Sequence, residues 1–464
     1  MKNAYILLLA FFLHIQVDLI SAEDTSLFNF PPEANPQLVG KLVSENLLSR
    51  DYMMYADDSG IHYAEIITAD AAITFATQTR DTSLFLQLEE RYTCFLKEEQ
   101  CNLVATGSHN KFMAALVVLD MYNWGKQENY LNSVYSLVQD KWDKWADPDP
   151  ITGILKSARF WADDMYFTPT LESRIFKIND DPSTIDRVTK WLTAYVDSLQ
   201  LPNGLIKHTT QVPFVWGRGS GWAAVGLTNA LQDMPLDHPK RAHLMDSYLK
   251  LMAGLKPYQS PNGLWRQLID YPEAWEETSG SAMFTYSMIT GIRMGWLEPE
   301  IYGPIVEKAW LALVNKLIEN GELADVCVGT NEKTTAQEYL DRPRRTGDMH
   351  GQAPVLWTAN ALLLLGSNAT SIDNEKLNWY TDDLMIYPNP AKDQVFIRMP
   401  NINDREISLN LYSVTGSLII SKQLSLPFAN DEISIHVSIL DDGLYIYQMK
   451  NTDVTFTGKL YINK

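Results

Sequence analysis

Apolar residues recur at helical spacing along the chain from about residue 34 to residue 365. Segments 112–122 and 222–231 carry apolar side chains at positions i, i+3 and i+4, the stripe that an amphipathic helix presents to a core. Segment 357–365 is apolar nearly all round, as expected of a fully buried helix. This part of the chain is therefore predicted to be helical.

Glycine-bearing loops divide the helical region into units of similar length. Two helices of ordinary length and their connections fill about 50 residues. Six loops lie 46 to 59 residues apart, at Gly60, Gly107, Gly153, Gly204, Gly263 and Gly321. Glycine punctuates many chains at this interval, but three of these loops also share turn-forming residues around the glycine. Six helical hairpins in series, closed into an all-α (α/α)₆ barrel over residues 30–370, are therefore predicted.

The pattern changes at residue 384 to short segments in which apolar and polar residues alternate. Strands are predicted at 394–398, 407–412, 418–424, 433–437, 444–449 and 458–462, separated by turn residues. Residues 384–464 are therefore predicted to form a small C-terminal β-sandwich. The polar segment 371–383 is expected to be a linker.

The N-terminus has the pattern of a signal peptide over residues 1–22. Lys2 precedes a run of apolar residues from 4 to 13, and small residues at Ser21 and Ala22 precede two acids. A buried N-terminal helix is the alternative interpretation. The apolar run is too short to span a bilayer comfortably, and no later run is long enough, so we expect no transmembrane segment.

Composition narrows the classes of partner. The 464 residues include 38 Lys and Arg against 57 Asp and Glu, a formal net charge of −19, with no basic run. This balance argues against a nucleic-acid or anionic-membrane binder. Three cysteines, Cys94, Cys101 and Cys327, exclude a dense disulfide framework, although the first two could pair locally. No Cys/His spacing suggests structural zinc, and we expect neither a metal nor a cofactor.

The densest group of chemically active residues is segment 159–166, just after the Gly153 loop, where Asp163 and Asp164 lie among large apolar residues. Successive helical residues point about 100° apart, so only one of the two acids faces inward. A carboxyl group in an apolar wall has its neutral form favoured, which suits a proton donor. A solvated pair of aspartates at a helix terminus is the alternative.

A second group lies at 216–222, where glycines alternate with larger residues. Trp216 and Trp222 can stack on sugar faces, and Arg218 can hold a carboxylate in a two-pronged hydrogen bond. His208, four residues after Gly204, is either a hydrogen-bond donor or a surface histidine. A glycine-rich turn with core tryptophans is the alternative. Loops that converge from one rim on a cavity are the pattern of a barrel enzyme.

Five motifs in order, at 161–166, 204–208, 216–222, 263–267 and 277–284, resemble the unsaturated glucuronyl and rhamnogalacturonyl hydrolases of glycoside hydrolase families 88 and 105, nearer the second. The resemblance covers about residues 40–365. It implies an (α/α)₆ barrel without a metal. The implied substrate is an anionic lyase product, of rhamnogalacturonan or ulvan type, with a 4,5-unsaturated uronic acid at its non-reducing end.

The resemblance also implies roles for individual residues. Asp163 falls on the general acid/base that protonates C4 of the enol ether, with Asp164 as the fallback, and water then adds at C5. Positions that bind the sugar ring and its carboxylate fall on His208, Trp216, Arg218 and Trp222. Two alternatives stay open: a different (α/α)₆ glycosidase or epimerase, and a non-catalytic oligosaccharide-binding protein.

Asn110 is a departure from the family pattern. Family members usually carry a second active-site aspartate where alignment on the stretch from Leu119 to Tyr122 places Asn110. An amide can hydrogen-bond a substrate hydroxyl, but it supplies no charge and takes no proton. We therefore expect Asn110 to bind substrate, and hydration needs only the one proton donor.

The tail resembles the type A sorting domain of the type IX secretion system. Four motifs match in order, at 387–390, 411–416, 442–445 and 458–462. The resemblance implies that the chain engages the type IX secretion machinery and is secreted or held at the cell surface. A carbohydrate-binding module is the alternative, but the tail lacks an obvious aromatic platform.

Overall fold

The computed structural model of the chain describes residues 27–56, 60–96, 108–144, 147–367, 385–387, 391–398, 406–413, 418–425, 432–450 and 455–464. The expected signal peptide and linker lie outside these residues, as does Cys101. Within the described part, no helix combines the length and apolarity needed to cross a membrane.

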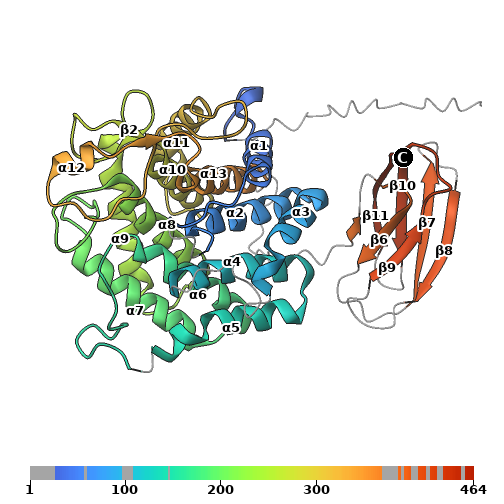
Figure 1. Cartoon of the computed structure of the whole chain (residues 1–464), viewed down its shortest axis with the longest axis horizontal. Coiled ribbons are helices and arrows are strands. Elements are labelled where there is room, and N and C mark those ends of the chain that lie inside the picture. Colours follow the sequence, from blue (N-terminus) through green and yellow to red (C-terminus); the bar gives the residue numbers. More distant parts are fainter. Residues whose placement is uncertain are drawn as a thin grey trace, which may run out of the picture.

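Six helices form a closed inner ring (Figure 1). Each packs against the next along the chain, and the last packs against the first. They are α2 (Tyr63–Thr79), α4 (Ser108–Gly125), α6 (Asp164–Asn179), α8 (Gly217–Asp233), α10 (Thr278–Arg293) and α13 (Met349–Ser367).

Six outer helices cover this ring, each against an inner partner. The first, α1, packs on α13 and α2, and each of the others packs on the inner helix that precedes it. They are α1 (Pro36–Ser49), α3 (Thr82–Tyr92), α5 (Glu128–Lys144), α7 (Pro182–Leu199), α9 (Arg241–Leu255) and α11 (Pro299–Val314). The predicted (α/α)₆ barrel of helical hairpins is confirmed.

The two rings differ in how their helices are buried and how they begin. The inner α2 is buried on nearly every side, whereas the outer α7 buries a single face. Three outer helices, α1, α3 and α7, begin with ordinary caps, in which Asn35, Asp81 and Asp181 accept from first-turn amides. Several inner helices begin instead at the residues that the sequence marks as chemically active.

Short elements fill the connections. Two small hairpins, β1 (Trp265–Arg266) with β2 (Glu276–Glu277) and β3 (Val326–Cys327) with β4 (Arg344–Arg345), precede α10 and α13. The helix α12 (Ala336–Leu340) lies between β3 and β4. Cys94 takes part in a disulfide bond, whereas Cys327 is a buried free thiol.

The C-terminal part is built from two antiparallel sheets, one ordered β11-β10-β7-β8 and the other β5-β6-β9. Alternate residues of both sheets, among them Leu409, Leu411, Val395 and Ile397, share one apolar core. This confirms the predicted small β-sandwich. The strands are β5 (Met385–Tyr387), β6 (Gln394–Arg398), β7 (Glu406–Ser413), β8 (Leu418–Ser425), β9 (Glu432–His436), β10 (Gly443–Lys450) and β11 (Thr455–Ile462).

The closest approach of α6 and α8 depends on Gly226. A Cβ atom at this position would overlap the backbone carbonyl of Met165. We predict that Gly226→Ala destabilises the barrel by about 1–3 kcal/mol, because backbone cannot move aside as a flexible side chain can.

Gly366, near the end of α13, is the matched control, since nothing lies within 4 Å of an added Cβ there. Gly366→Ala should leave the melting temperature unchanged or raise it slightly. Thermal unfolding of both variants checks the prediction, and an equal effect at the two positions would contradict it.

Candidate active site

The first turns of the inner helices meet at one end of the barrel. His62 directly precedes α2, Asp163 precedes α6, Trp216 precedes α8, Glu277 precedes α10 and Asp348 precedes α13. Because the inner helices are parallel, the positive ends of their dipoles point to this end of the barrel. The helix dipoles therefore favour an anionic ligand at this end of the barrel, even in a chain of net charge −19.

Asp163 holds a carboxyl group that the fold does not use. It is 9% exposed and makes no side-chain cap to α6. Its Oδ2 is buried without a hydrogen-bond partner in the described part of the chain, 3.5 Å from His208 Nε2. The carboxyl group is thus enclosed and faces an imidazole, and its Oδ2 atom can accept a further hydrogen bond.

Asp164, in contrast, is used by the fold. Its carboxylate accepts from Arg159 Nε at 3.1 Å and Nη2 at 2.5 Å, and from the Tyr195 hydroxyl at 3.1 Å. Its backbone carbonyl accepts from the indole of Trp191. The two adjacent acids therefore have different surroundings.

His208 is fully buried, with its ring beside those of Trp161 and Trp216 at 5.5 and 4.6 Å. The Tyr339 hydroxyl lies 2.6 Å from His208 Nδ1 and accepts from the backbone N–H of Lys333. Tyr339 therefore donates its own proton to Nδ1, which assigns the remaining imidazole proton to Nε2. That N–H faces Asp163.

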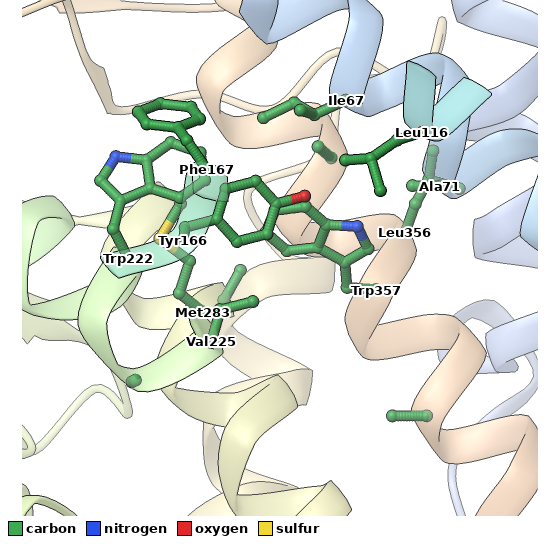
Figure 2. Packing of buried hydrophobic residues seen from close by; sticks show 14 of the residues in the cluster. Ile67, Ala71, Leu116, Tyr166, Phe167, Trp222, Val225, Met283, Leu356 and Trp357 are labelled. Atoms are coloured by element: carbon green, nitrogen blue, oxygen red, sulfur yellow. The ribbon is translucent and has the colours of Figure 1, made fainter. Parts of the chain in front are cut away.

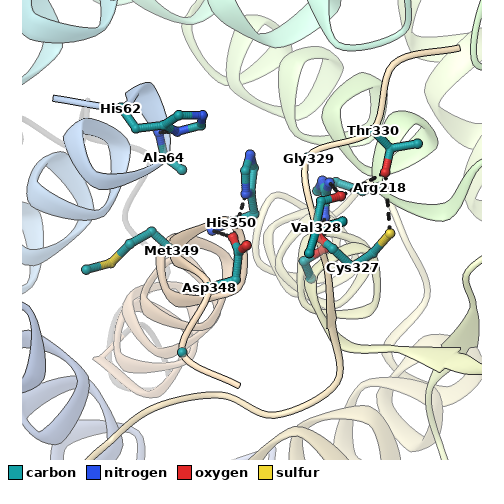
Figure 3. Close-up of polar contacts among 12 residues, drawn as sticks. His62, Ala64, Arg218, Cys327, Val328, Gly329, Thr330, Asp348, Met349 and His350 are labelled. Atoms are coloured by element: carbon teal, nitrogen blue, oxygen red, sulfur yellow. Dashed lines mark hydrogen bonds and ion pairs between the residues drawn. The ribbon is translucent and has the colours of Figure 1, made fainter. Parts of the chain in front are cut away.

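Arg218 is buried and braces the loop that follows β3 (Figure 3). Nη1 donates to the carbonyl of Cys327 and Nη2 to that of Val328 at 2.8 Å, while Cζ lies 4.6 Å from the Trp216 ring centroid. Both terminal nitrogens, expected to grip a carboxylate, thus already bind backbone. A ligand carboxylate would reach only the N–H groups that remain, including that of Nε, which has no partner in the described residues.

Trp222 and Asn110 complete the predicted set. Trp222 is fully buried below the site, with ring centroids of Tyr166 and Phe167 at 4.9 and 5.4 Å (Figure 2). Its aromatic neighbours, rather than solvent, surround it. Asn110 lies in the first turn of α4, and its side chain lies outside what the structure describes.

A chain of three polar residues that the motifs did not reveal lies at the starts of α2 and α13. Asp348 Oδ1 is 2.6 Å from His350 Nδ1, and His350 Nε2 is 2.8 Å from the Tyr63 hydroxyl. The Asp348 carboxylate accepts a hydrogen bond from Nδ1–H of His350, so Nε2 of His350 accepts from the Tyr63 hydroxyl. The His62 ring meets that of His350 edge-on at 5.3 Å (Figure 3).

These groups keep fixed charges at neutral pH. Burial, with a smaller contribution from His350, lowers the pKa of His62 to about 3. Burial and the charge of Arg218 lower the pKa of His350. Burial opposes ionisation of Asp348, but the hydrogen bond from His350 and the charge of Arg218 hold its pKa well below the usual range. Both imidazoles are therefore neutral and Asp348 is charged.

His62 and His350, which the motifs did not include, could have been found from their position after a glycine-bearing loop. His62 follows the Gly60 loop by two residues, and His350 follows Gly347, which has a positive φ of 74°, by three. Tyr339 carries no such signal because it lies inside a long connection. Among the described residues, no three His, Cys, Asp or Glu side chains are grouped as a metal site would require.

A barrel of paired helices with a buried, unsatisfied carboxyl group at its mouth is the architecture of a class of glycoside hydrolases. Residues 44–363, more than half of the chain, match the family model described as Glycosyl Hydrolase Family 88. The chain belongs to this family. Residues 385–463 match the model described as a secretion system C-terminal sorting domain, which confirms the resemblance of the tail and implies export.

Curated relatives match over shorter segments. An unsaturated 3S-rhamnoglycuronyl hydrolase of Alteromonas sp. (strain LOR) is 26% identical over 175 residues, 35% of this chain and 42% of that protein. One from Formosa agariphila is 32% identical over 120 residues, covering 25% and 32%. Unsaturated rhamnogalacturonyl hydrolase YesR of Bacillus subtilis is 24% identical over 206 residues, covering 42% and 57%. The matches thus span less than two thirds of each relative.

Solved structures share the fold. A possible member of family GH105 from Salmonella enterica superposes with a TM-score of 0.63 at 19% identity, covering 72% of this chain and 95% of that one. The unsaturated glucuronyl hydrolase from Bacillus sp. GL1 gives a TM-score of 0.53 at 14% identity, covering 71% and 95%. At these identities the likeness concerns the fold alone.

The charge state of His62 gives a test of the site electrostatics. We predict that its imidazole resonance, assigned by comparison with His62→Gln, stays unchanged between about pH 5 and about pH 8, because the neutral ring persists until about pH 3. Protonation of the unfolded chain then lowers the free energy of unfolding as the pH falls from about 6.5 towards about 3. A titration midpoint near 6.5 would contradict the assignment.

Proposed function

We propose that this chain is a glycosidase that removes a 4,5-unsaturated uronic acid from the non-reducing end of lyase-generated oligosaccharides. The single observation that carries the proposal is the carboxyl group of Asp163, which is buried, without a hydrogen-bond partner in the described residues, and 3.5 Å from an imidazole nitrogen. Membership of Glycosyl Hydrolase Family 88 supports the same chemistry.

The reaction is hydration of the enol ether. Asp163, as general acid, gives its proton to C4, and positive charge develops at C5 and the ring oxygen. Water adds at C5 and returns a proton to the Asp163 carboxylate. The resulting C5 hemiketal collapses to a ketone, which opens the ring and leaves a hemiacetal at C1. Collapse of that hemiacetal breaks the glycosidic bond and releases the former uronic acid as a 4-deoxy-5-keto sugar. One carboxyl group therefore serves both proton transfers, unlike the two-carboxylate displacement of other glycosidases.

The other site residues hold the sugar. The Nε2–H of His208, placed by Tyr339, is a donor for the ring substituents next to Asp163. Trp216, at the start of α8, is only 1% exposed and supports the sugar site from below through its contacts with His208 and Arg218, with Trp222 likewise in the packed layer. Arg218 and the helix N-termini supply the positive potential for the uronate carboxylate. We propose that Asn110, in the first turn of α4, binds a sugar hydroxyl.

Rhamnose-containing polyanions of rhamnogalacturonan or ulvan type are the proposed source of the substrate. Relatives with the printed names unsaturated 3S-rhamnoglycuronyl and unsaturated rhamnogalacturonyl hydrolase support this choice. We place the enzyme outside the cell or on its surface, exported by way of the signal peptide at residues 1–22 and then by the type IX machinery. The sorting-domain match at 385–463 supports that route.

Loss of the ultraviolet absorbance of the conjugated enol ether gives a direct test of Asp163. We predict that Asp163→Asn lowers turnover by about 10²–10⁴-fold on the active member of a panel of lyase products, because the amide cannot donate the proton. The panel includes fragments of rhamnogalacturonan, ulvan and a glycosaminoglycan.

Asp164→Asn is the matched control for Asp163→Asn. It should lower the melting temperature, because Arg159 and Tyr195 lose a charged partner, while the folded fraction loses far less turnover than with Asp163→Asn. If Asp164→Asn lost turnover and Asp163→Asn kept it, Asp164 rather than Asp163 would be the general acid. Unchanged absorbance with every substrate would favour a binding protein or a different glycosidase.

The departure at Asn110 can be tested by restoring the acid. We predict that Asn110→Asp changes turnover or the order of preference among the panel substrates, since a charged group replaces a neutral one beside the sugar. Steady-state kinetics with two panel members measures this. Identical constants for variant and parent would show that this position does not contact the substrate.

A further inference from the structure

A second polar cavity lies at the other end of the barrel. It encloses about 190 Å³ and is lined by residues from the later turns of all six inner helices. Tyr166, Trp222 and Trp357 pack against one another (Figure 2), and of these three only Trp357 lines the cavity, whose lining includes none of the candidate active-site residues. The cavity is therefore a separate compartment, to which the proposed hydrolysis assigns no role.

Charges at this cavity are largely matched among themselves. Arg174 Nη1 lies 2.6 Å from Asp70 and 3.4 Å from Asp120, and Lys177 lies 3.3 Å from Asp233. Burial and the neighbouring Asp70 raise the pKa of Asp120 to about 7. The C-terminal ends of the inner helices, which carry the negative ends of the dipoles, point to this cavity. Arg293 also lines the cavity, so the three cations Arg174, Lys177 and Arg293 face the three acids Asp70, Asp120 and Asp233, and the helix dipoles then oppose an added anion.

Neutral hydrogen-bonding groups remain to be satisfied. Asn360 is only 4% exposed, and its Nδ2 donates to the Ala71 carbonyl at 3.1 Å, yet its Oδ1 has no partner in the described residues. Gln78 Oε1 is likewise buried without a hydrogen-bond partner in the described residues. Both side chains line the cavity. Buried acceptors of this kind are nearly always paired, and the hydroxyl groups of a neutral ligand are donors that fit them.

The rest of the lining fits a sugar. Trp357 forms part of the wall, and an aromatic face packs well against the apolar C–H face of a pyranose. Asn229, whose Oδ1 accepts from the Tyr286 hydroxyl at 2.7 Å, adds a polar edge. The cavity volume of about 190 Å³ is room for one ring rather than for a chain.

We propose that this cavity binds a single neutral monosaccharide. Its hydroxyl groups donate to Asn360 Oδ1 and Gln78 Oε1, and one face of the ring lies against Trp357. The inference does not depend on the proposed hydrolysis, since no residue is shared between the two sites.

Calorimetric titration of the full chain tests the proposal. The neutral probes are rhamnose, galactose, glucose and xylose, and the anionic probes are galacturonate and glucuronate. We expect saturable binding of at least one neutral sugar and tighter binding of it than of either uronate. Gln78→Leu and Asn360→Leu should each weaken that binding by about tenfold, the equivalent of one lost hydrogen bond, whereas Asp163→Asn should leave it unchanged.

Several outcomes would overturn the proposal. They are the absence of saturable binding by every neutral sugar, uronates that bind as tightly, and binding that responds to Asp163→Asn but not to Gln78→Leu. Gln78 is only partly buried, so Gln78→Leu decides the test even if Asn360→Leu fails to fold.

Discussion

The contact between α13 and α2 closes the ring, and the site depends on that closure. Residues nearly 290 positions apart meet there, for example where the Asn360 amide donates to the Ala71 carbonyl and Tyr63 meets His350. In a closed ring of hairpins every inner helix runs the same way. First-turn residues then lie at one end of the barrel and last-turn residues at the other. The positive ends of the helix dipoles therefore meet at the first end and the negative ends at the second, as a result of topology alone.

Within the barrel, one residue of a neighbouring pair stabilises the structure while the other is proposed to take part in the reaction. Asp164 ties the start of α6 to Arg159 and Tyr195, and so holds the adjacent Asp163 in place without occupying it. Tyr339 does the same for His208 by fixing its tautomer from across the site. Glu277 caps α10 and also accepts from the Cys327 amide, which anchors the strand that Arg218 holds from its other side. The reactive groups are thus positioned by neighbours whose own hydrogen bonds are complete.

Periodicity and loop spacing were enough to predict the barrel and the sandwich, because helix burial and strand alternation are local patterns. The strand from Gln394 to Arg398 falls where the alternation placed it. Site residues could be predicted from the sequence only where a motif contained them, as at Asp163 and His208. Tyr339 and the pair Asp348 and His350 join the site through contacts across more than 100 residues, and single side chains in variable connections leave no periodic trace. Sequence spacing also could not reveal that the terminal nitrogens of Arg218 donate hydrogen bonds to backbone carbonyls of a loop far along the chain.

The burial of Cys327 has a consequence for the assembled molecule. An unpaired thiol in an oxidising environment ordinarily invites cross-linking between copies or mixed disulfides with small thiols. Cys327 is fully enclosed, and burial raises the pKa of its thiol, so neither the reactive thiolate nor a path for attack is present in the folded state. The odd cysteine is therefore compatible with a monomeric protein of long lifetime outside the cell, and it becomes a liability only during folding, before the β3 strand is covered.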